Sequence, residues 1–321
     1  MGGLFGGGSG GQNTVDPVIG ALNVQTSTLG MAIPIAYGQN RLSANLIWYG
    51  DFTAIPHTTT QSSGGKGGGG ASSSNTTFTY KAAVAMGLCE GTVGGIGNVW
   101  AGKDLTNLAA LGLTLFSGAP AQTAWGYLTT NHATQAIGYS NLAYVATSAY
   151  DLGGSANLPS HSFEVLGVLN YSPISGTYGA KPDLLLTDYL TSSIYGVGFL
   201  SAKIASLTQY NAYCMAAGIL LSPIYAAQAS ANTHIDDIMT ATNSGVVWSE
   251  GLLKVIPYGD TAITGAWGTN YTPVNTVQYD LNDDDFIAGS NADPIIVTRK
   301  TQADSFNQVQ VEYHHMNLSV D

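Results

Sequence analysis

The sequence is poor in charged residues. Asp, Glu, Lys and Arg make up 9% of its 321 residues, against about 25% in typical soluble domains. The surface must therefore consist mostly of Ser, Thr, Asn, Gln, Tyr and Gly. Because such a surface has little charge to desolvate when subunits pack together, the composition favours a subunit of an obligate assembly. A secreted β-protein such as an adhesin has a similar surface, and composition alone does not separate these two classes.

Basic residues are scarcer than acidic ones. The chain has 9 Lys and Arg against 20 Asp and Glu, a net charge of −11. Stable nucleic-acid binding depends on basic side chains that neutralise phosphates, so this charge balance argues against it. Transient passage of DNA through a lumen is compatible with the same balance.

Cysteines and long apolar runs are also scarce. The two cysteines, Cys89 and Cys214, lie far apart in the sequence, which argues against a disulfide framework or a zinc site. A membrane span needs about 18 apolar residues, and the longest candidate, residues 212–231, is broken by glycine, serine and proline. The first eleven residues have glycines where a signal peptide needs a basic and then an apolar stretch. We expect a soluble chain without a signal peptide.

Hydrophobic residues, by contrast, make up an ordinary 45% of the chain. The length exceeds the roughly 250 to 300 residues that one core usually holds, so we expect two or three domains. The predicted divisions are a flexible arm at 1–18, an N-terminal β domain at 19–175, an α/β middle domain at 176–260 and the start of a further β domain at 261–321.

Glycine is concentrated in two stretches. The first, at the N-terminus, reads MGGLFGGGSGGQNT, and we expect a partner to be needed to order it because ordering glycine is costly in backbone entropy. The second, Gly64–Gly70, reads GGKGGGG within a Ser/Thr-rich insertion at 58–77. The insertion is predicted to be an extended loop or a hairpin tip. A phosphate-binding P-loop is excluded there, because Gly67 follows Lys66 where the motif needs Ser or Thr.

Strand patterns dominate the first half of the chain. Residues 31–37 and 46–49 are short apolar runs, and the polar segment 38–41 between them predicts a strand pair joined by a turn. Residues 78–86 alternate in the manner of a half-buried strand, and 162–169 form another apolar run. We therefore expect a mainly β first half.

The second half mixes helical and strand patterns. Helices are predicted over 182–190, 207–218 and 233–242, with Thr233 as an N-cap. A hairpin is predicted from Val246 to Ile256 with its turn at 249–251, followed by strands at 295–298 and 309–313.

Five stretches of the chain, in order, resemble the phage tail-tip family that includes the lambda-type tip attachment protein and related baseplate hub proteins. They are Ile33–Gly38 with Arg41–Asp51, Ala85–Gly91 with Ile96–Trp100, Asp183–Thr191 with Tyr195–Gly198, Val247–Pro257, and Asp304–Tyr313. The structural positions of these motifs are Tyr37, Gly38, Arg41, Trp48, Tyr49, Gly50, Gly91, Trp100, Tyr195, Gly196, Trp248 and Gly251.

The resemblance implies a predominantly β, α+β hub of β-barrel-like domains with a small helical and hairpin domain, in a homotrimeric ring. It implies a structural virion protein at the tail tip, assembled in the host cytoplasm, which closes the distal tail tube and relays host contact toward DNA release. The implied partners are further copies of the chain, a distal tail protein, a tape measure protein and other tail-tip proteins, with the host envelope contacted indirectly. No cofactor is implied.

Candidate chemical sites are few. Asp283, Asp284 and Asp285 could offer oxygen ligands to calcium, but their spacing lacks the glycine and distal glutamate of an EF-hand, and a solvated turn is the favoured interpretation. The six histidines form no metal motif, and the G-x-S-x-G match at 7–11 lies in the glycine arm. We therefore expect no catalytic residues and no enzyme. A carbohydrate-binding adhesin and a tail-associated cell-wall hydrolase remain the alternatives.

Overall fold

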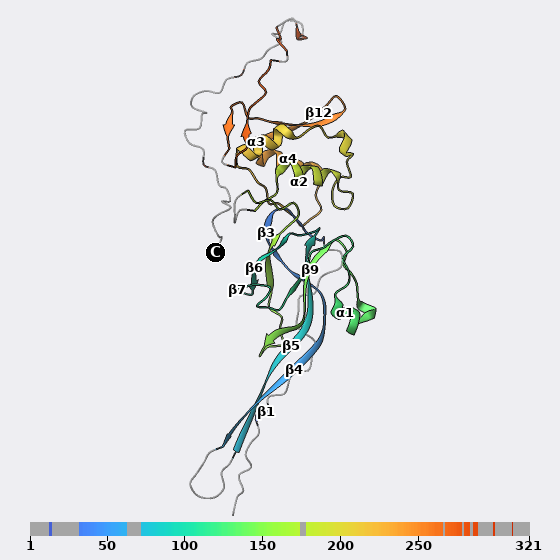
Figure 1. The fold of residues 1–321 in the computed structure, drawn as a ribbon, viewed down its shortest axis with the longest axis vertical. Helices are drawn as coiled ribbons and strands as arrows, with labels where there is room; N and C mark the ends of the chain where they lie inside the picture. Colours follow the sequence, from blue (N-terminus) through green and yellow to red (C-terminus); the bar gives the residue numbers. More distant parts are fainter. Residues whose placement is uncertain are drawn as a thin grey trace, which may run out of the picture.

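The computed structural model describes residues 13–14, 32–62, 72–173, 178–265, 267–277, 279–282, 285–287, 298 and 310. The described chain is elongated (Figure 1): a β body carries a long hairpin at one end and a mixed helical body at the other.

The first sheet of the β body is built around one long strand. Its members are β1 (Asn13–Thr14), β4 (Asn45–Ser62), β5 (Ser72–Glu90), β8 (Thr114–Phe116) and β9 (Leu142–Gly153). The central strand β5 pairs antiparallel with β4 along one edge and with β9 along the other, and β8 follows β9. Farther out along β5, β1 pairs with it in parallel at Asn75 and Thr76.

The second sheet covers one face of the first. It contains β3 (Gln39–Ser43), β6 (Gly95–Ala101), β7 (Asp104–Thr106) and β10 (His161–Leu166), all paired antiparallel in the order β3, β10, β6, β7. Side chains of β5 such as Val84 and Met86 share a core cluster with Phe163 and Val165 of this sheet. Burying each such side chain contributes about 1.5 to 3 kcal/mol.

The opposite face of β5 is buried as well. Ala83 and Ala85 share a cluster with Tyr144 of β9 and with Trp125 and Leu128, which flank or belong to the helix α1 (Gly126–Asn131). The prediction of a half-buried strand was therefore wrong for the inner part of β5. Alternation alone could not reveal this, because alanine on the second face fits either solvent or a close-packed layer.

Helices α2 (Pro182–Thr191), α3 (Thr208–Ala216) and α4 (Ala231–Ala241) make up the second body together with the hairpin of β12 (Ser244–Ser249) and β13 (Leu252–Pro257). Two short antiparallel pairs complete the strands: β2 (Ile35–Ala36) pairs with β11 (Ile224–Tyr225), and β14 (Ile263–Thr264) pairs with β15 (Asn270–Tyr271). Two short 3-10 helices are η1 (Ala133–Gln135) and η2 (Ser201–Lys203). No helix in the described ranges has the length and apolar character of a membrane span.

The strand β2 joins the two cores. Ala36 belongs to the core of the β body, whereas its neighbours Ile35 and Tyr37 belong to the core around Leu185, Tyr210 and other side chains of the helical body. Successive residues of a strand point to opposite sides, so one short strand contributes to both.

The comparison with the sequence expectations is mixed. The predominantly β, α+β class, the three helices and the second-half hairpin are confirmed, although the described sheets are open and form no closed barrel. The N-cap of α4 is Ser230, whose hydroxyl accepts from the Thr233 amide at 3.3 Å, so the prediction of Thr233 was wrong. The predicted strands at 295–298 and 309–313 lie outside the described residues apart from isolated positions. The domain divisions stay predictions.

The predicted turn at 38–41 was also wrong. Residues 39–41 belong to β3, which pairs with β10, while β2 pairs with β11 and β4 with β5. The partners of β2 and β3 come from more than a hundred residues away, and their backbone hydrogen bonds override the polar local pattern.

Candidate assembly surfaces

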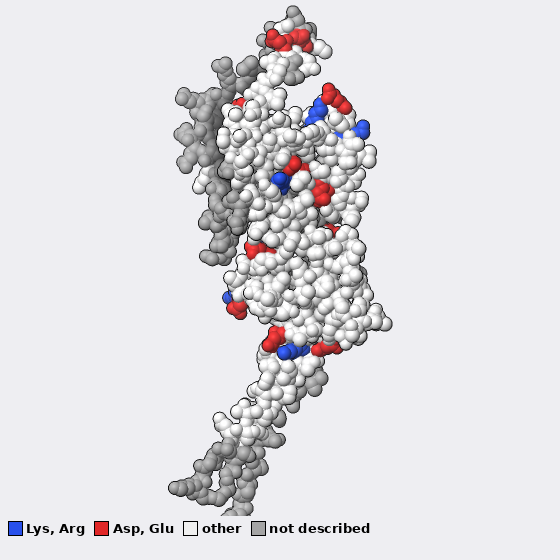
Figure 2. All heavy atoms as spheres, viewed as in Figure 1, with Lys and Arg blue, Asp and Glu red and all other residues white. Residues whose placement is uncertain are grey.

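The described surface is poor in charge, as the composition predicts. Figure 2 shows isolated acidic and basic side chains separated by broad uncharged areas on the visible face. Within the described ranges the ion pairs are His132 with Asp51, at 2.7 Å, and Lys254 with Glu250, at 2.6 Å. Such a surface can be covered by neighbours at low desolvation cost.

The paired ends of β4 and β5 form an arm that projects from the β body (Figure 1). Pairing with β9 ends at Tyr80, whereas pairing between β4 and β5 continues to Ser62 and Ser72. The arm's outer part is rich in Thr and Ser and mostly exposed, and the Thr58 and Thr76 hydroxyls hydrogen bond across it at 2.9 Å. Within the predicted insertion at 58–77, the described residues 58–62 and 72–77 belong to paired strands, which agrees with the hairpin alternative. Apart from the short contact with β1 at Asn75 and Thr76, the described part of the arm is a two-stranded ribbon. Such a ribbon is marginally stable alone, so contact with another chain would stabilise it.

The β12–β13 hairpin is the second prominent surface feature. Leu253 and Val255 pack against the helical core, whereas Val247 and Ile256 are exposed. Trp248, a predicted motif position, is also exposed and contacts Phe199 edge to face, with ring centroids 6.3 Å apart. Large exposed apolar side chains gathered on one element are typical of interaction surfaces.

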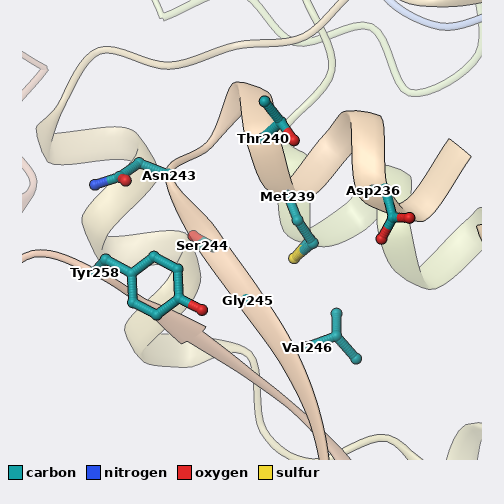
Figure 3. A pocket seen from close by; sticks show the side chains of 8 residues that line it. All are labelled: Asp236, Met239, Thr240, Asn243, Ser244, Gly245, Val246 and Tyr258. Atoms are coloured by element: carbon teal, nitrogen blue, oxygen red, sulfur yellow. The ribbon is translucent and has the colours of Figure 1, made fainter. Parts of the chain in front are cut away.

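An open groove of about 470 Å³ lies between α4 and the hairpin. Figure 3 shows its lining residues, Asp236, Met239, Thr240, Asn243, Ser244, Gly245, Val246 and Tyr258. Asp236 is the single charged side chain among them. The lining combines this carboxylate with the hydroxyls of Thr240, Ser244 and Tyr258, so the groove is largely uncharged, like the rest of the described surface.

The structure brings two predicted motif positions together at Asp188. The hydroxyls of Tyr37 and Tyr195 both donate to Asp188 Oδ2, each at 2.7 Å. Burial, together with the bond to this carboxylate, raises the pKa of both tyrosines well above the usual range. No local sequence pattern indicates Asp188 as the shared acceptor, because Tyr37 lies 151 residues from it along the chain.

A second pair of motif positions meets in the β body. The Arg41 guanidinium lies 3.8 Å from the centroid of the Trp100 ring, and Arg41 Nε donates to Ser162 Oγ at 2.9 Å. The three residues come from the adjacent strands β3, β6 and β10. This cation–π contact fixes the side chains of the first two motifs relative to each other.

Trp48, another motif position, holds α1 against the sheet. Its Nε1 donates to Gln135 Oε1 at 2.6 Å, and its ring contacts Trp125 and His132. A side chain at Gly50 would come within 2.8 Å of the Trp48 ring, which explains the glycine. The neighbouring Tyr49 is exposed and contributes to the surface.

Beside Trp48, the Asp51 carboxylate accepts hydrogen bonds from Tyr127 and His132. These two contacts, that from Tyr127 foremost, lower the pKa of Asp51. Local sequence patterns do not reveal this cluster, because Asp51 lies 76 residues from Tyr127 and 81 residues from His132. It links β4 to the segment carrying α1.

The motif glycines have different structural reasons. Gly38 and Gly91 have positive φ angles of 65° and 101°, and a side chain at either would meet Ser222 or Val168. A side chain at Gly196 would collide with the Tyr189 carbonyl oxygen. Gly251 has a φ of 73° in the hairpin turn, with open space around it. Positive φ is the conformation that favours glycine.

The calcium candidates lie at the margin of the described chain. Asp283 and Asp284 lie outside it, and Asp285 Oδ2 accepts from the Asn282 amide at 2.9 Å in a turn. No group of three or more His, Cys, Asp or Glu side chains converges among the described residues. Cys89 and Cys214 are buried in different core clusters, and burial raises the pKa of each thiol to about 12.

Residues 230–319, which include α4 and the β12–β13 hairpin, match the family model Phage-tail_3, described as "Putative phage tail protein". This match supports a phage-tail-type virion protein. No curated protein matches the chain. Among solved structures, the chain is similar to one from the "Virion of native gene transfer agent (GTA) particle", with 19% identity and a TM-score of 0.46, over 78% of this chain and 58% of that one. This chain therefore spans less than two thirds of that protein's length.

Proposed function

We propose that the chain is a structural subunit of the tail tip, a baseplate hub or tip attachment protein. The main supporting observation is a surface poor in charge, from which a polar arm and an apolar hairpin project. Both features suit burial by neighbouring subunits better than exposure to solvent. The family match at 230–319 supports the placement in a tail, and the hairpin lies within the matched residues.

In this role the chain acts mechanically, without catalysis or a cofactor. It forms a homotrimeric ring that closes the distal tail tube and organises the other tip proteins, among them the distal tail and tape measure proteins. Subunit interfaces with two discrete arrangements keep the lumen shut until host contact favours the open one. The excess of acidic residues suits a lumen through which DNA passes without binding.

Light scattering tests the proposal by measuring the mass of the full chain, alone and with a distal tail protein of the same phage type. We expect three times the chain mass and a stable complex with that partner. A chain that stays monomeric and ignores the partner would refute the hub role. Clearing of host peptidoglycan in a zymogram would instead identify a cell-wall hydrolase.

Deletion of residues 58–77 tests the contribution of the arm. The body's core clusters draw on other residues, so the variant should keep the wild-type melting temperature while losing its complex with the distal tail protein. Substituting Leu105, an exposed residue of the β body, with Ser is the matched control and should leave the complex intact. Unchanged binding after deletion would exclude the arm from this interface.

A further inference from the structure

The β12–β13 hairpin has an apolar face and an edge that the described part of its own chain leaves open. Directly opposed residues share a face of an antiparallel pair. The register pairs Gly245 with Ile256 and Val247 with Lys254, which places Val247 and Ile256 together on the face away from the helical core. They remain 38% and 49% exposed.

The two edges of this hairpin differ. On the β13 side, Leu253 forms a parallel bridge with Ile204, and its carbonyl accepts from the Ala205 amide at 2.9 Å. Among the described residues, β12 pairs with β13 and with no second strand. An unpaired edge exposes backbone donors and acceptors that can pair with an added strand.

The segment that follows β15 has the complementary properties. Val277, Tyr279 and Leu281 recur at every second residue, the spacing of a strand with one apolar face. They are 79%, 81% and 58% exposed, and none of the three belongs to a strand. The described part of this segment extends away from the helical body (Figure 1).

We infer that the segment around Val277–Leu281 of one copy adds as a strand to the β12 edge of a second copy, packing its apolar side chains beside Val247 and Ile256. Among the described residues, this segment is exposed and unpaired with β12 of its own chain, so we assign the edge to the segment of a neighbouring copy. When extended, the roughly ten residues from Tyr271 to Leu281 span up to about 35 Å, enough to reach a neighbouring copy.

This contact joins two different patches, the segment of one copy and the hairpin of the next. Such heterologous contacts generate rings when the rotation closes. The inference therefore rests on the proposed ring-forming function and specifies one of its interfaces. Asp280 lies between the apolar positions and would point to the opposite side of the added strand, toward solvent.

Two variants test the contact by light scattering and sedimentation of the full chain. The segment variant carries Val277→Ser, Tyr279→Ser and Leu281→Ser, and the hairpin variant carries Val247→Ser and Ile256→Ser. Each should weaken self-association by about a hundredfold or more, since buried aromatic and aliphatic anchors dominate such interfaces. Leu105→Ser, which removes an exposed apolar side chain from β7 in the β body, away from the β12–β13 hairpin (Figure 1), should leave self-association unchanged.

Mixing the two variants gives the sharpest result. The segment variant keeps an intact hairpin and the hairpin variant keeps an intact segment, so a mixture should form 1:1 dimers although each variant alone stays monomeric. If either variant alone has the wild-type mass, or if the mixture stays monomeric, the inference is overturned. The hub proposal still stands in that case, provided that the wild-type chain is a trimer. A wild-type chain that is monomeric even with its distal tail partner overturns both. Circular dichroism confirms that the variants are folded.

Discussion

Replacing Tyr37 with Phe tests whether the Asp188 contact stabilises the helical body. The substitution keeps the buried ring and removes one hydroxyl donor from the carboxylate. A hydrogen bond to a charged group contributes about 1.5 to 3 kcal/mol. Because Tyr195 still donates to the same oxygen, we expect the lower end, about 1.5 kcal/mol. This corresponds to a fall of roughly 2 °C in the melting temperature of a chain of this size.

The assay is urea unfolding, with the melting temperature as a second readout. Tyr225→Phe is the matched control, because its hydroxyl is buried with no hydrogen-bond partner in the described part of the chain and its ring packs against Tyr37, with centroids 6.0 Å apart. Removal of this unpaired hydroxyl should leave the free energy of unfolding unchanged or raise it slightly. The double variant Tyr37→Phe with Tyr195→Phe should lose more unfolding free energy than the two single variants together, since Asp188 then loses both donors. Equal effects of Tyr37→Phe and the control, or strict additivity, would refute the reasoning.

Three further predictions concern the β body and its junction. Gly38→Ala should lower the free energy of unfolding by about 2 to 4 kcal/mol, because it adds strain at positive φ and a clash with Ser222. Gly251→Ala adds the same strain but has open space around it, so it should lower the free energy of unfolding by about 1 kcal/mol. Urea unfolding measures both. Burial lowers the pKa of His161 below its unfolded value of about 6.5. As the pH falls, the unfolded chain therefore binds a proton at this histidine before the folded chain does. The contribution of His161 to the free energy of unfolding is fully present above about pH 6.5 and decreases below it. His161→Gln should flatten the dependence of the urea midpoint between pH 7 and 5, and an unchanged slope would contradict this. Arg41→Lys should lower stability by about 0.5 to 1 kcal/mol through weaker stacking on Trp100, an effect that should vanish in a Trp100→Leu background.

Elements with a strong local pattern could be predicted from the sequence. The helix at 182–191 begins with a proline that suits the first turn, and the hairpin at 244–257 turns at Glu250 and Gly251, both at positive φ. Their conformations follow from interactions between near neighbours. The short helix at 126–131 was missed, because it has only one fully buried side chain, Leu128, and no side-chain cap.

The composition of the sequence determined that this surface carries little charge and suits contact with other subunits. Only the tertiary structure decided which residues meet: the strand at 39–43 forms because β10 supplies its partners, and Tyr37 reaches Asp188 only after the helical body has packed. It likewise decided that Val277, Tyr279 and Leu281 stay exposed while Val84 and Phe163 are buried, although all five are apolar. The exposed fraction of a side chain depends on what packs against it. The packing partners of Val84 and Phe163 come from distant parts of the chain, so local sequence patterns do not reveal them.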